Sequence, residues 1–113
     1  MISARDEAAL AQTTGEIREA PGTEVDYHAT DLTRVDDVRA LVKRTVERFG
    51  GLNVLVSNAG GPPAGSFDTV SDEDWRGAFE PNLMSVVKLV REALPHARRG
   101  FRRIVNVASS SIK

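Results

Sequence analysis

The stretch VLVSNAGGPP, residues 54–63, decides the fold of this chain. It continues an apolar run that begins at residue 52, and such a run is typical of a strand covered on both faces of a parallel sheet. Asn58 and two glycines follow soon after. Glycine lets the backbone approach a ligand closely, and an asparagine amide can tie neighbouring strand ends together. The stretch therefore predicts a buried strand that ends at a binding edge.

Segments with helical and strand patterns alternate on either side of this stretch. Strands are predicted at residues 2–4, 24–29, 52–56 and 103–107, and helices at residues 6–20, 35–49 and 71–94. The second helix has the clearest pattern, because its apolar residues recur at spacings of three and four. This order predicts an α/β fold with parallel β-α-β units, right-handed crossovers and a doubly wound sheet.

The ends of the two longer helices are marked by residues that favour helix caps. Thr33 is a predicted N-cap with Asp36 at the third helical position, and Ser71 is a predicted N-cap with Asp74 three residues later. Pro81 lies inside the third helix and lacks a backbone N–H, so a bend is expected there.

Composition limits the possible functions. A chain of 113 residues with 41% hydrophobic and 27% charged residues fits one globular domain. A net charge of -1 provides no general attraction to nucleic acid or to anionic lipid. The chain has no cysteine and no apolar run of membrane length, so we expect a cytoplasmic protein that does not enter a membrane. His28 and His96 lack metal-ligand spacing, and no metal site is predicted.

Polar residues follow three of the predicted strands. Asp31 follows the second strand, Asn58 follows the third, and Ser109 follows the fourth. In an open parallel sheet ligands bind beyond the carboxyl ends of the strands, so these residues are expected at one edge. Each also has a simpler interpretation, since Asp31 alone fits a helix cap, Asn58 a turn residue and Ser109 a polar strand end.

Three ordered motifs resemble those of short-chain dehydrogenases/reductases. Residues 54–60, VLVSNAG, resemble the family's LVNNAG segment, residues 31–33, DLT, resemble its DVT turn, and residues 103–109, RIVNVAS, resemble its RIVNISS strand. The resemblance covers essentially all of the chain. It implies an NAD(P)-binding domain of Rossmann type over residues 1–113, and an oxidoreductase that transfers hydride between the nucleotide and a small carbonyl or alcohol substrate.

The resemblance also implies roles at the cofactor. Asp31 and Leu32 match positions that contact the adenine ring. The segment Asn58, Ala59 and Gly60 matches the one that lines the adenosine ribose and stabilises the central sheet.

The family's ribose-binding acid at the end of the strand at residues 2–4 is absent, and Arg5 follows that strand instead. A cation at this place suits a 2′-phosphate, so NADP is favoured over NAD. Among catalytic positions, Ser109 matches the serine that hydrogen-bonds the substrate carbonyl, and Asn82 matches the asparagine that holds a water in the proton relay.

Two parts of the family pattern lie outside the sequence. The Gly-rich turn would precede Met1, and the Tyr-xxx-Lys pair would follow Lys113. We therefore expect an incomplete doubly wound sheet that lacks its first strand and its C-terminal part. Since that first strand is the central one, the remaining strands should form two pairs with a gap between them.

These departures leave two hypotheses. In the first, the chain is a fragment of an NADP-dependent oxidoreductase and is inactive in isolation. In the second, it is a non-catalytic nucleotide-binding remnant or an oligomerisation module. Either hypothesis allows a homo-oligomer formed through the long helix around Trp75 to Leu94, in which Trp75 and Phe79 are predicted to anchor the core.

Overall fold

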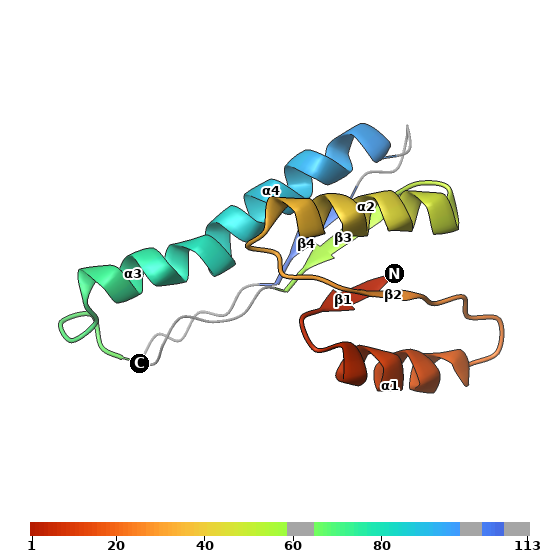
Figure 1. Cartoon of the computed structure of the whole chain (residues 1–113), viewed down its shortest axis with the longest axis horizontal. Coiled ribbons are helices and arrows are strands. Elements are labelled where there is room, and N and C mark those ends of the chain that lie inside the picture. The colour runs from red at the N-terminus through yellow and green to blue at the C-terminus, as the bar shows by residue number, and fades with distance from the viewer. Residues whose placement is uncertain (59–64, 98–102, 108–113) are drawn as a thin grey trace.

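The computed structural model describes residues 1–58, 65–97 and 103–107, and strands alternate with helices along them (Figure 1). The elements are β1 (Ile2–Ala4), α1 (Glu7–Arg18), β2 (Tyr27–Ala29), α2 (Val35–Phe49), β3 (Val54–Ser57), α3 (Asp72–Phe79), the π-helical segment η1 (Glu80–Met84), α4 (Ser85–Ala93), the 3-10 segment η2 (Leu94–His96) and β4 (Arg103–Asn106). Each predicted element is present, although the second strand is shorter than predicted.

The four strands form two separate parallel pairs. β1 pairs with β2 in the register Ile2 with Tyr27, and β3 pairs with β4 in the register Val54 with Arg103. This arrangement confirms the expected α/β fold with an incomplete parallel sheet. A cavity of about 550 Å³ separates the two pairs, and its lining comes from β1, β3, α2 and α4. Ser57 lies at its edge, where its buried hydroxyl has no hydrogen-bond partner within the described residues.

The core lies between α2 and α4, which run in the same direction, and one face of β3 (Figure 1). Val38, Leu41 and Val42 of α2 pack against Leu89 and Ala93 of α4, as the side-by-side placement of the two helices in Figure 1 illustrates. Partly buried apolar side chains pack against this cluster; among them are Val46, Leu52 and Leu55. The hydrophobic stripe of α2 thus supplies three of the five buried residues of this cluster, as its spacing predicts.

The prediction that the third strand is covered on both faces is wrong for the described residues. Leu55 packs against the core and Ser57 is buried, whereas Val54 and Val56 are 53% and 58% exposed. Alternate side chains of a strand point to opposite faces. The α2 and α4 helices therefore cover one face of β3, and the valines lie on the other face.

The third predicted helix is a nearly continuous rod made of α3, η1 and α4 (Figure 1). Its predicted start is confirmed, because the Ser71 hydroxyl accepts a hydrogen bond from the backbone N–H of Asp74 at 3.1 Å and donates to its carboxylate at 2.6 Å. At Pro81 the helix adopts π-helical geometry, in which the Ser85 N–H donates to the Glu80 carbonyl five residues earlier. The proline at which a bend is expected thus lies in a π-helical segment, and such segments are common sites of helix kinks.

The prediction that Trp75 and Phe79 anchor the core is also wrong. These side chains are 48% and 56% exposed, and α3 extends away from both strand pairs (Figure 1). Trp75 makes an edge-to-face contact with Phe67, whose ring centroid lies 6.0 Å away. Because α3 projects beyond the sheets, its apolar residues have no sheet to pack against.

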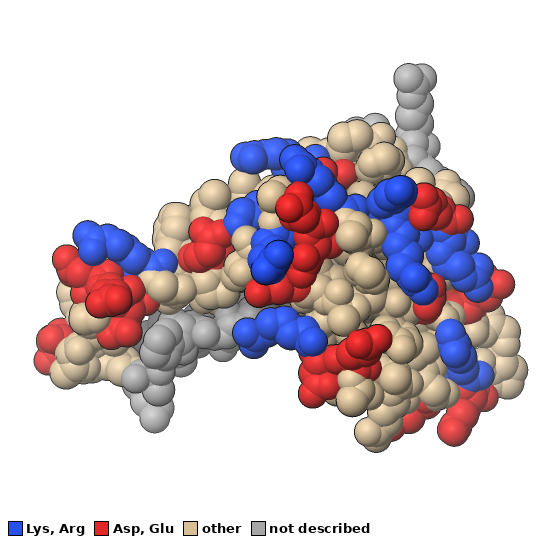
Figure 2. Space-filling view, viewed as in Figure 1, with Lys and Arg blue, Asp and Glu red and all other residues tan. Residues whose placement is uncertain are grey.

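The projecting helix gives the chain an elongated shape. Its radius of gyration is 15.9 Å, compared with about 13 Å for a compact domain of 100 residues. Acidic and basic side chains are interspersed on the face shown in Figure 2, with no large area of one sign. In the described part of the chain, no helix has the length and apolar character needed to cross a membrane.

Candidate functional site

A cavity of about 420 Å³ opens at the carboxyl ends of β1, β2 and β3. Its lining residues are Ser3, Ala4, Arg5, Thr30, Asp31, Leu32, Thr33, Asn58, Pro81 and Ser85. Four of the residues predicted from the sequence therefore meet here, namely Arg5, Asp31, Leu32 and Asn58. They come from three different strand ends, so the parallel arrangement of the strands brings them together.

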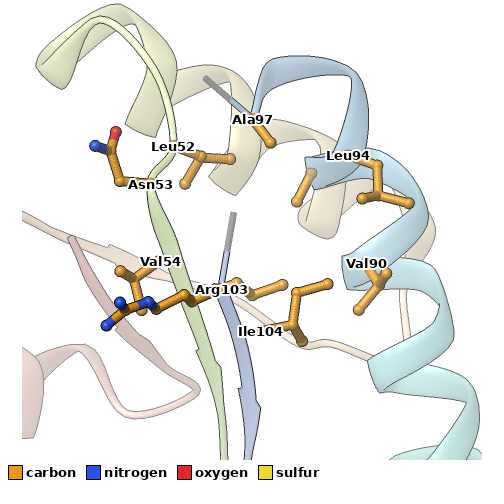
Figure 3. A pocket seen from close by; sticks show the side chains of 10 residues that line it. Leu52, Asn53, Val54, Val90, Leu94, Ala97, Arg103 and Ile104 are labelled. Atoms are coloured by element: carbon orange, nitrogen blue, oxygen red, sulfur yellow. The ribbon is translucent and has the colours of Figure 1, made fainter. Parts of the chain in front are cut away.

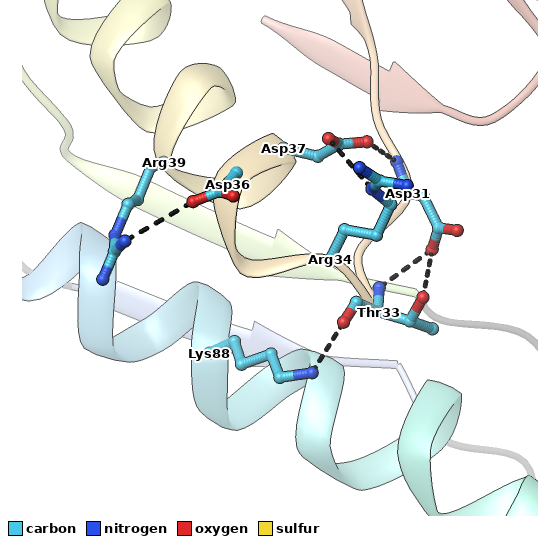
Figure 4. Close-up of polar contacts among 7 residues, drawn as sticks. All are labelled: Asp31, Thr33, Arg34, Asp36, Asp37, Arg39 and Lys88. Atoms are coloured by element: carbon cyan, nitrogen blue, oxygen red, sulfur yellow. Dashed lines mark hydrogen bonds and ion pairs between the residues drawn. The ribbon is translucent and has the colours of Figure 1, made fainter.

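The turn that carries Asp31 is fixed by its own polar groups. The Asp31 carboxylate accepts hydrogen bonds from the backbone N–H and the hydroxyl of Thr33, at 2.9 and 2.7 Å, through the same oxygen. The Arg34 N–H donates to the Asp31 carbonyl at 3.0 Å, and the Asp31 N–H donates to the Asp37 carboxylate at 3.2 Å. The backbone N–H, the backbone carbonyl and the carboxylate of Asp31 are thus all hydrogen-bonded within the turn and the start of α2, as Figure 4 shows for the side-chain contacts.

This network explains why Thr33 is not the N-cap of α2. Its hydroxyl donates to Asp31, and the N-cap is the next residue, Arg34, which makes no side-chain capping bond. The Thr33 bonds lower the pKa of Asp31 below its ordinary value, and the nearby charges of Arg5 and Arg34 lower it further. The cavity therefore contains a carboxylate that is ionised at neutral pH, with an arginine on its rim.

Asn82 lies next to the cavity, and its amide is engaged within the helix. Its side-chain N–H donates to the Ala78 carbonyl at 2.7 Å, while its neighbours Pro81 and Ser85 line the cavity wall. The Ser85 hydroxyl in turn donates to the Pro81 carbonyl at 2.5 Å. The side chains of Asn82 and Ser85 thus bond carbonyls in and beside the π-helical segment, where the regular hydrogen-bond ladder changes register.

Three predicted site residues, Ala59, Gly60 and Ser109, lie outside the described residues. Asn58 is the last described residue before residues 59–64. It lines both the cavity at the strand ends and the cavity between the strand pairs. Ser85 also lines the cavity and belongs to none of the motifs in the sequence, although its position three residues after Asn82 places it near the same helical face.

A third, much smaller cavity of about 30 Å³ lies at the opposite end of β3 and β4 (Figure 3). Its lining is largely apolar and includes Leu52, Val54, Val90 and Ile104. A volume of this size accommodates about one water molecule, and the cavity is far from the carboxyl ends of the strands. It is therefore a packing gap below η2, and the larger cavity at the strand ends is the candidate site.

The whole chain, residues 1–113, matches the family model described as short chain dehydrogenase. The chain belongs to the short-chain dehydrogenase family. It is 40% identical over 115 residues to a Streptomyces coelicolor protein provisionally named a ketoacyl reductase, a match that covers 99% of this chain and 44% of the relative. It is also 40% identical over 93 residues to L-fucose dehydrogenase of Bos taurus, with 81% of this chain and 34% of that protein covered.

Solved structures of short-chain dehydrogenases share the fold. A variant of actinorhodin polyketide ketoreductase, crystallised with NADPH, superposes with a TM-score of 0.84 at 41% identity over 95% of this chain and 42% of that one. A Burkholderia phymatum member in complex with NAD gives a TM-score of 0.83 at 36% identity over 95% of this chain and 38% of that one. The chain thus spans less than half the length of these family members.

Proposed function

We propose that residues 1–113 form part of the NAD(P)-binding Rossmann-like domain of an oxidoreductase, with NADP as the cofactor and a small carbonyl or alcohol as substrate. The observation that carries this proposal is the cavity of about 420 Å³ at the strand ends, lined by Arg5, Asp31, Leu32 and Asn58. Similarity to a ketoreductase crystallised with NADPH supports it. Nicotinamide supplies the hydride in such a reaction.

The residues of the cavity fit a nucleotide in size and in chemistry. The adenine ring is flat and largely apolar, and Leu32 with its neighbouring turn offers it one wall. Arg5 offers a guanidinium group, which suits the doubly charged 2′-phosphate of NADP better than the ribose hydroxyls of NAD. Asn58 offers amide groups for the adenosine ribose at the end of β3.

Two residues are proposed to act on the substrate side. Ser109 hydrogen-bonds the substrate carbonyl oxygen and so stabilises the charge that develops there. Asn82 helps to hold a water in the proton relay. The Asn82 amide N–H already donates to Ala78, so its side-chain oxygen is the group proposed to contact that water.

Cofactor preference is tested by titrating the chain with NADPH and with NADH, before and after Arg5→Ala. We expect the substitution to weaken NADPH binding about tenfold more than NADH binding, which corresponds to about 1.4 kcal/mol. Arg76→Ala is the matched control, because Arg76 is exposed on α3 and does not line the cavity. Equal losses for both nucleotides would contradict the proposed role of Arg5.

The role of Ser109 is tested by comparing Ser109→Ala with Ser110→Ala in the protein that contains the complete active site. The first substitution should lower kcat strongly and leave NADPH affinity unchanged, since a hydroxyl on the substrate carbonyl acts on the reaction step. The second should alter neither quantity. A comparable loss of kcat in both variants would indicate that neither serine is specifically catalytic.

A second candidate function is assembly, either alongside catalysis or as a non-catalytic nucleotide-binding or oligomerisation module. Trp75, Phe79 and Leu83 recur every four residues along the projecting helix and are 46 to 56% exposed. We propose that this stripe, which continues toward Leu94, forms a homo-oligomer interface. Phe79→Glu should shift the sedimentation coefficient toward that of the monomer, whereas Glu73→Gln on the same helix should not.

A cytoplasmic location is a further prediction, to be checked by cell fractionation.

A further inference from the structure

Lys88 connects two walls of the candidate site that are far apart in the sequence. Its ammonium group donates to the backbone carbonyl of Thr33 at 2.7 Å, and it also bonds the Glu80 carboxylate in η1. Thr33 belongs to the turn after β2, whereas Glu80 and Lys88 belong to the long helix. Figure 4 shows the Lys88 side chain reaching from α4 to the carbonyl of Thr33.

The position of Lys88 favours a strong interaction. Its side chain is only 20% exposed, so its aliphatic stem is largely covered while the charge meets two acceptors. Hydrogen bonds from a charged donor are shorter and stronger than neutral ones. The exposed pair between Lys43 and Glu47, at 3.8 Å with side chains 76% and 65% exposed, lacks this burial.

The two elements that Lys88 joins both line the cavity. Leu32 and Thr33 line it from the turn, and Pro81 and Ser85 line it from the helix. Asp31 bonds the N–H and the hydroxyl of Thr33, so the turn is rigid internally. The Thr33 carbonyl is the point at which Lys88 attaches this rigid turn to the helix.

We propose that Lys88 is a positioning residue of the nucleotide site, whose ammonium sets the distance between the Asp31–Thr33 turn and the helix that carries Asn82. This inference rests on the proposed function of the cavity. A turn held in place before the ligand arrives does not have to be ordered on binding, and binding is tighter as a result. The same contact transmits a displacement of the turn to η1, where Asn82 lies.

The test uses Lys88→Met, which keeps a long apolar stem and a good helix former but removes the charge. Lys88→Arg is the conservative variant, and Lys43→Met is the matched control for removal of a lysine. Each variant is titrated with NADPH. Hydrogen exchange is measured at the amides of Thr33 and Arg34, which are bonded to Asp31 in the turn. Global stability is measured by urea unfolding.

We expect Lys88→Met to weaken NADPH binding about tenfold and to speed exchange at the two turn amides by a similar factor. Lys88→Arg should restore most of both effects, and Lys43→Met should change neither. Unchanged NADPH affinity in Lys88→Met would overturn the inference. So would a loss of affinity accompanied by unchanged exchange at the turn, because Lys88 would then not act by holding the turn in place.

A different result would contradict the proposed function of the cavity. A wild-type chain that binds neither NADPH nor NADH would contradict the nucleotide site itself. Exchange at Thr33 and Arg34 needs no ligand, so it then decides separately whether Lys88 holds the turn. Faster exchange in Lys88→Met would support the contact, and unchanged exchange would refute it.

Discussion

Leu89→Ala should be among the most destabilising single substitutions in this chain. Leu89 is 5% exposed and packs in the cluster that joins α2 to α4. The substitution removes three carbons, which at about 0.8 kcal/mol each amounts to about 2.4 kcal/mol of lost burial. The cavity left behind adds to this, so the expected loss is about 3 kcal/mol, within the usual range of about 2–5 kcal/mol for such substitutions. A domain has only about 5–15 kcal/mol of stability to lose.

The matched control is Leu83→Ala in η1, six residues earlier on the same long helix. Leu83 is 46% exposed in the monomer, so at a protein concentration at which the chain is monomeric only about half of the burial is lost and we expect about 1 kcal/mol. Equilibrium urea unfolding followed by far-UV circular dichroism measures both values, and an unchanged slope shows that the unfolding transition is comparable. A loss for Leu89→Ala that is no greater than the loss for Leu83→Ala would refute the assignment of the core to the interface between α2 and α4.

Other substitutions test the local structure. Gly15→Ala should stabilise α1 by about 1 kcal/mol, because the added carbon meets nothing within 4 Å. Gly50→Ala should destabilise the folded chain by about the same amount, because the φ of Gly50 is 73°. Urea unfolding should therefore show changes in the free energy of unfolding of opposite sign for the two variants. Ser71→Ala should cost about 1 kcal/mol by removing the cap of α3, and a change within error would argue against that cap. The Tyr27 N–H holds the pKa of Asp26 below its ordinary value of 3.8, and Arg44 at 3.2 Å adds to this. Because this pKa is lower in the folded state, the Asp26 carboxylate stabilises the folded chain at pH values above 3.8, and this stabilisation is lost as the pH falls through the lower folded value. Asp26→Asn should therefore flatten the acid side of the stability profile, as measured by unfolding between about pH 5 and about pH 2.

The elements with strong periodicity were predictable from the sequence. The apolar stripe from Val35 to Phe49 predicted α2 with its buried face, because period alone fixes which residues can share a face. The run that includes Val54 to Val56 predicted the position of β3 but not which of its faces is covered. The capping bond of Ser71 with Asp74 is local, and it was also predicted correctly. Local patterns succeed where the partner lies within a few residues.

The failures arise where a competing or distant partner decides the outcome. Threonine is a common N-cap residue, but the Thr33 hydroxyl instead donates a hydrogen bond to the Asp31 carboxylate. Trp75 fits a core residue by type, but its helix extends past the sheets. Lys88 bonds a carbonyl 55 residues away, and no pattern within its own helix indicates that contact. The gathering of Arg5, Asp31, Leu32 and Asn58 was predictable, since it follows from parallel strands alone.

The two interpretations of Asp31, as a structural residue of the turn and as a ligand contact, are compatible at the level of atoms. Both bonds from Thr33 go to one carboxylate oxygen, Oδ1. In the described part of the chain the hydrogen bonds to this carboxylate go to Oδ1 and none to the second oxygen, Oδ2, and Asp31 is one of the residues that line the cavity (Figure 4). The structural bonds therefore orient the group and keep it ionised, while the second oxygen stays available to a ligand. A carboxylate fixed in this way loses little freedom on binding, so its structural role strengthens the proposed contact with the nucleotide.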